Sequence, residues 1–277
     1  MKNQILHIIL PTDNTGFKIA ELENWPGKVF IVPRASIKDL KDRTEVNNPA
    51  IYFLFGDNDE ATKQKLYIGE TETFLNRLLN HDQNKEFWNL AVIFIGGIDK
   101  AKIKYLEYIS SKEAKEIERY DLENNTIPKK PHLAEYNEIA TLDYFEKVKY
   151  ILSVLGFPVF ENIKQSLSDS QFYYLKGDGV RAEAQLLNDS SLVIFKGSLA
   201  RKRETESFWG WSQAARKKFI EDGTFADSGD GISYNYTRDV IFKSPTAAAA
   251  TTLGRSVNGW TAWKDGDGNT LDENLRK

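Results

Sequence analysis

The stretches PAIYFLFG at residues 49–56 and KLYIGET at residues 65–71 decide how the first half of this chain folds. Each is a short run of apolar, β-branched and aromatic residues, which is typical of a β-strand. The stretch between them is polar and rich in Asp and Asn, so the two runs predict a hairpin with a long connection. Each predicted strand carries one tyrosine, Tyr52 or Tyr67.

These two tyrosines are predicted to face the same side of the hairpin. Side chains two apart along a strand share a face, so Tyr52 lies beside Ala50 and Tyr67 lies beside Gly69. An antiparallel pairing brings both phenols to one side, where the small Ala50 and Gly69 leave room for a substrate backbone. Taken singly, strand tyrosines are most often half-buried packing residues, so a functional role depends on what lies near them.

A helix is predicted directly after the hairpin, from Thr73 to His81. Its buried face consists of apolar residues at helical spacing: Phe74, Leu75, Leu78 and Leu79. Arg77 and His81 are four residues apart, so they lie one above the other on this helix. Alone, each would be interpreted as a surface residue, but next to two tyrosines they form a candidate polar cluster.

A solitary carboxylate, Glu107, lies on the next predicted helix. Residues 91–95 form a third, buried strand, and Asp99 then caps a helix that runs to about Tyr120. Periodicity places Glu107 on or beside the inward stripe of this helix. A carboxylate there is costly unless it is paired or bound to a cation. Two interpretations follow, a salt bridge to a lysine such as Lys104 or a metal site.

The order of these residues resembles the GIY-YIG nuclease family, whose two tyrosines, arginine and metal-binding glutamate cut phosphodiester bonds. The resemblance covers about residues 50–125. It implies that Tyr52 or Tyr67 activates or orients the attacking water and that Glu107 holds one divalent metal, Mg²⁺ or Mn²⁺. It also implies that Arg77 stabilises the attacked phosphate, a task suited to a planar guanidinium that remains charged.

Three details of this resemblance concern single residues. The first motif reads AIY, and Ala50 adds one methyl group to the usual glycine without removing a catalytic atom or needing a positive φ. His81 matches a histidine that some restriction-type members carry one turn after the arginine, which implies an assisting role. Members often have an asparagine after the glutamate helix, and Asn124 and Asn125 are both available. A turn-forming role is the alternative for either asparagine.

Composition limits the function only broadly. The chain has 277 residues, a net charge of −3 and no cysteine, so bulk charge gives no support to nucleic-acid binding and thiolate metal sites are excluded. The N-terminal apolar run is broken by His7 and ended by Pro11, which makes it too short for a secretory signal or a membrane span. We therefore expect a soluble, cytoplasmic protein with no membrane partner. The sequence does not indicate its oligomeric state.

The second half of the chain is predicted to be a separate module. Residues 172–175 and 192–195 are strand candidates, a helix is expected within 207–221, and Ser244-Pro245 is a strong helix start. The stretches YYLKGDGVRAEA, VIFKGSLAR and SPTAAAATTLGRSVNGWTAW resemble a conserved domain of unknown function that follows GIY-YIG nucleases. The last stretch also resembles the restriction-associated RAMA module, which has been proposed to sense DNA or its modification.

Basic and aromatic residues of this module are candidates for nucleic-acid contact, because cations can hold phosphates while aromatic rings stack on bases. The candidates are Arg201, Lys202, Arg203, Trp209, Trp211, Arg216, Lys217 and Lys218. The alternative is that the tryptophans anchor a small core and that acidic residues balance the basic ones.

The sequence thus predicts a two-domain α+β protein. Residues 1–160 form a domain with a small antiparallel sheet flanked by helices and a strand-rich N-terminal extension over 1–49, and residues 161–277 form a small α+β domain for DNA recognition or regulation. The expected activity is metal-dependent hydrolysis of DNA phosphodiester bonds, and a setting in restriction or phage defence is implied by the resemblance alone. Two alternatives remain: a non-catalytic protein that binds nucleic acid or senses its modification, and a protein-interaction scaffold.

Overall fold

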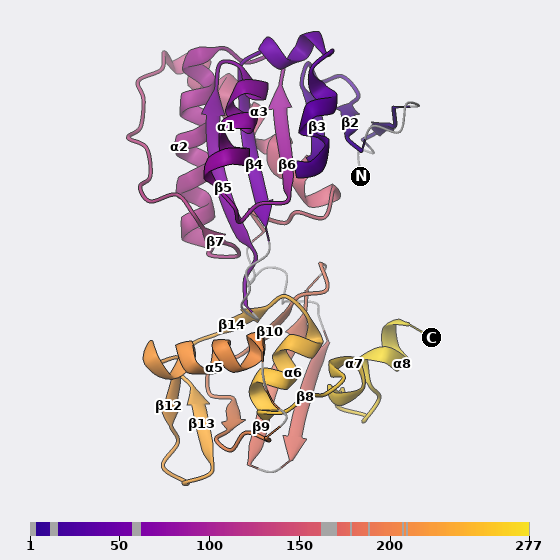
Figure 1. Ribbon diagram of the computed structural model, residues 1–277, viewed down its shortest axis with the longest axis vertical. Coiled ribbons are helices and arrows are strands. Elements are labelled where there is room, and N and C mark those ends of the chain that lie inside the picture. Colours follow the sequence, from indigo (N-terminus) through magenta and orange to yellow (C-terminus); the bar gives the residue numbers. More distant parts are fainter. Residues whose placement is uncertain are drawn as a thin grey trace. The chain divides into compact units, whose positions relative to one another are not determined.

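Two mixed sheet-and-helix units make up the part of the chain that the structure describes (Figure 1). The computed structural model describes residues 4–11, 16–56, 62–161, 171–177, 179–187, 189–206, 208 and 210–276. The first unit ends at Phe160 and the second begins at Glu161. The α+β class expected from the sequence is confirmed.

The first unit is built on one sheet with the strand order β1-β2-β3-β6-β4-β5-β7. Its strands are β1 (Leu6–Ile9), β2 (Lys18–Leu22), β3 (Lys28–Pro33), β4 (Ala50–Gly56), β5 (Lys65–Thr71), β6 (Leu90–Ile95) and β7 (Asp121–Leu122). Neighbouring strands pair antiparallel, except that β5 and β7 run parallel. The predicted hairpin is confirmed as β4 and β5, and the predicted third strand as β6.

The strand-rich N-terminal extension forms part of the same sheet. β3 pairs with β6 along its whole length, and β2 and β1 continue the sheet outward from β3. The apolar runs at residues 5–10 and 29–32 indicate β1 and β3 in the sequence, but no such run marks β2. The KIAEL sequence of β2 has a charged residue at its first and fourth positions and a buried alanine in its middle, so its period-two signal is weak.

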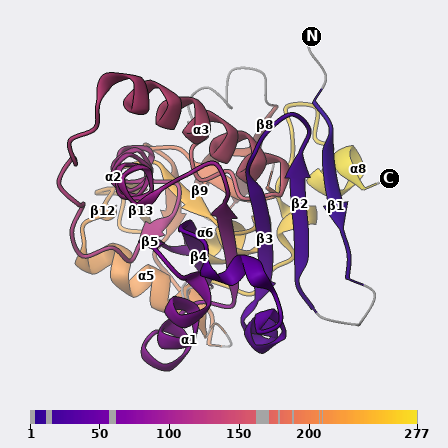
Figure 2. The same cartoon turned by 90° about the horizontal axis from the view of Figure 1, so that it is seen from above.

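Helices cover both faces of the central strands. On one face lie α2 (Lys100–Ile117) and α3 (Glu135–Val154), and on the other lie α1 (Phe74–Asn84) and the 3₁₀ turns η1 (Arg34–Leu40) and η2 (Thr44–Asn47). Figure 2 shows α1 and α2 on opposite sides of β4 and β5. The capping role predicted for Asp99 is confirmed, because its Oδ1 accepts hydrogen bonds from the amides of Ala101 and Lys102, both at 3.0 Å.

The second unit is built on a second antiparallel sheet. Its strands are β8 (Phe172–Gly177), β9 (Val180–Leu186), β10 (Leu192–Ile194), β11 (Leu199–Arg201), β12 (Phe225–Asp227), β13 (Ser233–Tyr236) and β14 (Val240–Phe242). The order is β12-β13-β11-β9-β10-β14, and β8 pairs with β9.

Two longer helices, α5 (Trp211–Glu221) and α6 (Pro245–Leu253), pack against this second sheet, and two short ones follow, α7 (Gly259–Ala262) and α8 (Leu271–Leu275). The predicted start of α6 is confirmed, because the Ser244 hydroxyl accepts a hydrogen bond from the Ala247 amide at 3.1 Å. The helix ends at Gly254, whose φ of +62° lies in the left-handed region that favours glycine.

None of the helices in the described residues is both long enough and apolar enough to cross a lipid bilayer.

Candidate functional site

The register of the β4–β5 hairpin brings the two predicted tyrosines together. Tyr52 lies directly opposite Gly69, and Leu54 lies opposite Tyr67. Both phenols therefore project from the face that α1 covers, and their ring centroids are 6.2 Å apart. Tyr52 is almost completely buried, with 1% of its surface exposed, whereas Tyr67 is only partly buried.

The small residues beside the tyrosines have a different role from the one predicted. The ring of Tyr52 lies across Gly69, so a Cβ added at this glycine would clash with the Tyr52 hydroxyl. Gly69 therefore makes room for a side chain of the protein rather than directly for a substrate. Ala50 is fully buried in the core between the sheet and α1, so its methyl group fills core space and does not narrow an open site.

Helix α1 supplies the arginine and the histidine. Its buried residues are Phe74, Leu78 and His81, so the apolar side of the helix holds Arg77 and His81 against the tyrosines. Arg77 Nε donates a hydrogen bond to the Tyr52 hydroxyl at 3.1 Å, and the guanidinium also hydrogen-bonds Tyr67. These bonds to the two phenols, Tyr52 first, raise the pKa of Arg77. The sequence placed His81 on the helix surface when taken alone, but only 3% of it is exposed.

A chain of hydrogen bonds runs from Arg77 through Tyr52 to His81. The Tyr52 hydroxyl lies 2.8 Å from His81 Nε2. Because Arg77 Nε–H can only donate, the Tyr52 oxygen accepts that bond and its own proton is available to Nε2. Burial and the positive charges of Arg77 and Lys85 lower the pKa of His81 to about 4, so at neutral pH the ring is uncharged and Nε2 can accept. Burial, mainly, raises the pKa of Tyr52, so this hydroxyl keeps its proton.

Glu107 reaches this cluster from α2. Its carboxylate is half-buried, and it is close enough to the backbone amide of Glu70 for that amide to lower its pKa and close enough to Arg77 and Tyr52 for their charges to act on one another. Helices α2 and α1 cover opposite faces of the sheet. Glu107 therefore meets the cluster at the outer edge of β5, the edge away from β4, where β7 pairs with β5 only as far as Leu66. Burial and then the nearby Glu70 raise the pKa of Glu107 to about 7.

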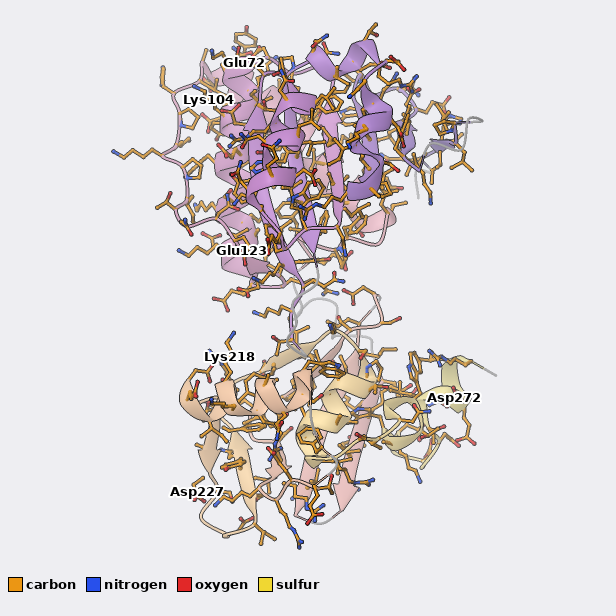
Figure 3. The ribbon with its side chains drawn as sticks, in the orientation of Figure 1. Glu72, Lys104, Glu123, Lys218, Asp227 and Asp272 are labelled. Atoms are coloured by element: carbon orange, nitrogen blue, oxygen red, sulfur yellow. The ribbon has the colours of Figure 1, made fainter. Side chains whose placement is uncertain are left out.

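The environment of Glu107 fits a divalent cation held by a single carboxylate. Burial and the charge of Glu70 destabilise the anionic form of Glu107, and a bound cation would offset both effects. The predicted alternative, a salt bridge to Lys104, is not formed: Lys104, which is exposed (Figure 3), lowers the pKa of Glu107 only through its charge. Within the described residues no cluster of three or more metal-ligating side chains exists. Mg²⁺ commonly takes one or two carboxylates and completes its shell with water and substrate oxygens.

Asn124 completes the edge of β5 and resolves the choice between two asparagines. Its Oδ1 accepts from the Ile68 amide at 2.9 Å, and its Nδ2 donates to the Ile68 carbonyl at 2.7 Å. Before it along the edge, the amide of Glu123 donates to the Leu66 carbonyl at 2.8 Å, and after it the Glu107 carboxylate lies near the Glu70 amide. Asn124 thus prolongs the pairing of β5, while Asn125 is exposed.

Two residues near the cluster were not identified from the sequence. Lys85 Nζ lies 4.2 Å from the centroid of the Tyr67 ring, and the carboxylate of Glu70 is close enough to Glu107 to raise its pKa. The spacing of Arg77 and His81 continues for four more residues to Lys85, so helical periodicity could have found this lysine. Glu70 directly follows Gly69 in the second motif, but no sequence pattern marks it.

The nucleic-acid candidates of the second unit are scattered and one is excluded. Arg216 is 1% exposed, and its guanidinium donates to Glu204 at 2.8 Å and to the backbone carbonyls of Thr251 and Arg201, both at 2.6 Å. With its donors used inside the protein, Arg216 cannot reach a phosphate, so this prediction is wrong. The adjacent basic residues Lys217 and Lys218 do not predict the burial of Arg216, because consecutive residues of a helix point to different sides.

The remaining candidates of that set lie in different settings. Lys202 forms an ion pair with Asp227 at 2.7 Å. The exposed ones are Arg203, Trp211, Lys217 and Lys218, and Arg201 is partly buried. Trp209 lies outside the described residues. The structure does not gather these side chains into one patch comparable to the cluster in the first unit.

Comparison with known families agrees with this geometry. Residues 48–137 match the model of the GIY-YIG catalytic domain. The chain carries a GIY-YIG domain. Residues 173–275 match a domain of unknown function, DUF4357. No curated protein and no solved structure matches the chain.

The GIY-YIG domain belongs to a nuclease family. It contains the five residues predicted for the site, which are Tyr52, Tyr67, Arg77, His81 and Glu107. The matched segment runs from before β4 to the start of α3. It therefore excludes β1, β2 and β3, which complete the same sheet. The match supports the nuclease class, while the roles of the individual side chains rest on the geometry described above.

The two asparagines of the GIY-YIG domain should differ in their contribution to stability. Replacement of Asn124 by Ala removes both hydrogen bonds to Ile68 at the sheet edge, and we expect the free energy of unfolding to fall by about 1–3 kcal/mol. Asn125→Ala, at the exposed neighbouring position, should change it by less than about 0.5 kcal/mol. Urea unfolding followed by tryptophan fluorescence measures both. Equal effects of the two substitutions would show that Asn124 does not hold the edge.

His81 should make the stability of the GIY-YIG domain depend on pH. Its pKa in the folded chain, about 4, lies below its ordinary value of 6.5, so between these values the unfolded chain binds the proton more readily and stability is lost as the pH falls. His81→Gln keeps a hydrogen-bond acceptor but cannot titrate. Urea unfolding at a series of pH values should therefore show a smaller loss for His81→Gln than for the native chain.

His132, which is exposed, provides the matched control for that measurement. The His132→Gln protein should follow the native pH profile. If the His81→Gln profile also coincides with the native one, the neutral, buried state assigned to His81 is incorrect.

Proposed function

We propose that the first unit is a metal-dependent endonuclease that hydrolyses phosphodiester bonds in DNA. The observation that supports this most is the convergence of Tyr52, Tyr67, Arg77 and Glu107 from four different elements on one edge of the sheet. Hydrolysis of a phosphodiester needs a positioned water, a cation against the attacked phosphate and charge stabilisation of the leaving oxygen. These four side chains can meet those three needs.

In this proposal Arg77 contacts the attacked phosphate. Its Nε is used by Tyr52, and the side chain is exposed, so the terminal nitrogens face the solvent side of the cluster. A guanidinium can donate two parallel hydrogen bonds to phosphate oxygens and remains charged at any working pH. The bond to the buried Tyr52 fixes the direction in which this fork points.

The two tyrosines have different roles. Tyr52 is buried and already bonded on both sides to Arg77 and His81, so it orients Arg77 and has no access to bulk water. Tyr67 is partly exposed and bonded to Arg77, so it is the phenol that contacts the attacking water. His81 assists as a neutral acceptor that holds the Tyr52 hydroxyl in place.

Glu107 is the residue that would hold Mg²⁺ or Mn²⁺. Bound there, the cation would offset the negative charge that develops on the phosphate and on the leaving oxygen. The proximity of Glu107 to Arg77 supports this role, because a cation held by Glu107 would then lie near the phosphate proposed for Arg77. The setting in restriction or phage defence rests on the family resemblance alone.

A plasmid assay tests the proposal directly. With Mg²⁺ the native chain should convert supercoiled plasmid to the nicked form, and EDTA should abolish this. The Glu107→Ala substitution should lower the rate by about 100-fold or more, the order expected when a group that stabilises transition-state charge is lost. Glu116, an exposed glutamate of the same helix, provides the matched control, and Glu116→Ala should nick at the native rate.

Two outcomes would contradict this assignment. Equal rates for the Glu107→Ala and native proteins would remove Glu107 from the mechanism. Tight plasmid binding with no nicking by any of the proteins would instead favour the alternative expected from the sequence, a non-catalytic nucleic-acid-binding protein on a nuclease scaffold.

A further inference from the structure

Among the helices of the described residues, α5 and α6 pack against one face of the second sheet, and none packs against the β8–β9 part of the other face. The buried residues of β8 and β9, among them Tyr173, Leu175 and Ala182, belong to the core that α5 and α6 form with this sheet. Alternate residues of the same strands point to the other side, where Gln185 is buried and five others are exposed or partly exposed. These are Phe172, Tyr174, Lys176, Arg181 and Glu183. All of them except Phe172 line an open groove together with Phe195, Lys196 and Leu199, which we name the sheet groove, and Phe172 packs against Phe195 beside it.

The sheet groove contains two cations placed directly opposite each other. Lys176 and Arg181 are register partners on β8 and β9. Like charges in this arrangement repel each other and destabilise a sheet. Among the described residues neither of them has an ion-pair partner, although Lys176 Nζ lies 5.6 Å from the centroid of the Tyr174 ring. An anion bound between them would relieve this repulsion.

Further charges around the groove keep its balance positive. Lys196 contributes a third cation at one side of the groove. The acidic groups are Glu183, which lies in the groove, and Asp239, whose carboxylate accepts from the Lys196 backbone amide at 2.8 Å. Leu199 is the register partner of Arg181, so Arg201, two residues further along β11, lies on the same face. Arg201 belongs to the basic set predicted from the sequence, although it is not among the residues that line the groove.

Aromatic rings accompany the cations. Phe172 is 42% exposed on its strand, and its ring centroid lies 5.9 Å from that of Phe195. Tyr174, two residues along from Phe172, is partly exposed on the same face. Exposure of large aromatic rings to water on an open sheet face is unfavourable, because no core packing covers them. Unpaired nucleic-acid bases could cover these rings by stacking on them.

We propose that the sheet groove binds single-stranded nucleic acid, with the cations on the phosphates and the exposed rings against unpaired bases. The alternation of aromatic and basic residues on one sheet face supports a single strand over a duplex, because the bases of a duplex are stacked on each other and cannot reach the rings. The inference goes beyond the nuclease proposal and does not depend on it, since it concerns binding by the second unit.

Fluorescence anisotropy with labelled oligo(dT) and oligo(U), in EDTA so that no strand is cut, tests this proposal on the full chain. The Lys176→Gln/Arg181→Gln double substitution should weaken binding and make the slope of log Kd against log salt concentration shallower by about 1.4. Phe172→Ala should weaken binding by about tenfold. Glu183→Gln should tighten binding, because it removes the carboxylate from the groove. Comparison of the two oligonucleotides shows whether DNA or RNA is preferred.

Lys217 and Lys218 provide the control for this experiment. Both are exposed cations on α5, away from the sheet groove, and both belong to the basic set predicted from the sequence. The Lys217→Gln/Lys218→Gln protein should bind as the native chain does, and circular dichroism should show the same fold for all variants. The proposal is overturned if the native chain binds neither oligonucleotide, if only the Lys217/Lys218 variant loses affinity, or if a duplex binds as tightly and Phe172→Ala has no effect. Plasmid nicking is scored separately, so either proposal can fail alone.

Discussion

The placement of the Tyr52 ring across Gly69 is the constraint on which the arrangement of the site depends. The β4–β5 register sets this pair opposite each other, and the absence of a Cβ at Gly69 lets the phenol lie close to the β5 backbone. From there its hydroxyl meets both Arg77 and His81 on α1. A slip of one residue would turn Tyr52 to the opposite face of the sheet. The glycine of the second motif is thus needed for the position of a tyrosine in the first.

The edge of β5 explains how a residue from the opposite side of the sheet joins this cluster. β7 pairs with only the first part of β5, and Asn124 extends the pairing by one position through its side chain. The Glu107 carboxylate then lies near the next outward amide, that of Glu70, close enough for that amide to lower its pKa. A short partner strand leaves that position open, so a helix on the far face can present a carboxylate to groups on the near face. Burial of that carboxylate destabilises its charge, which is the environment in which a bound cation gains most.

The sequence anticipated those parts of the fold that depend on local patterns. The apolar runs of β4, β5 and β6, the cap of α2 by Asp99 and the Ser244-Pro245 start of α6 are local signals, and all five features are present. The features that were missed depend on contacts between distant segments. Examples are the pairing of Asn124 with Ile68, the burial of His81 against Tyr52, and the burial of Arg216 beneath Glu204 and Thr251. The pairing of Lys176 with Arg181 likewise follows from a register that no single stretch of sequence states.

The central claim is that one carboxylate, one guanidinium and two phenols share a site that accepts a divalent cation. Anomalous X-ray scattering from crystals soaked in Mn²⁺ tests this claim most directly, because it locates the ion independently of any activity. The account predicts an anomalous peak within direct coordination distance of the Glu107 carboxylate, on the side that faces Arg77. Absence of a peak at Glu107, or a Glu107 side chain turned to bulk solvent away from Arg77 and Tyr52, would contradict it.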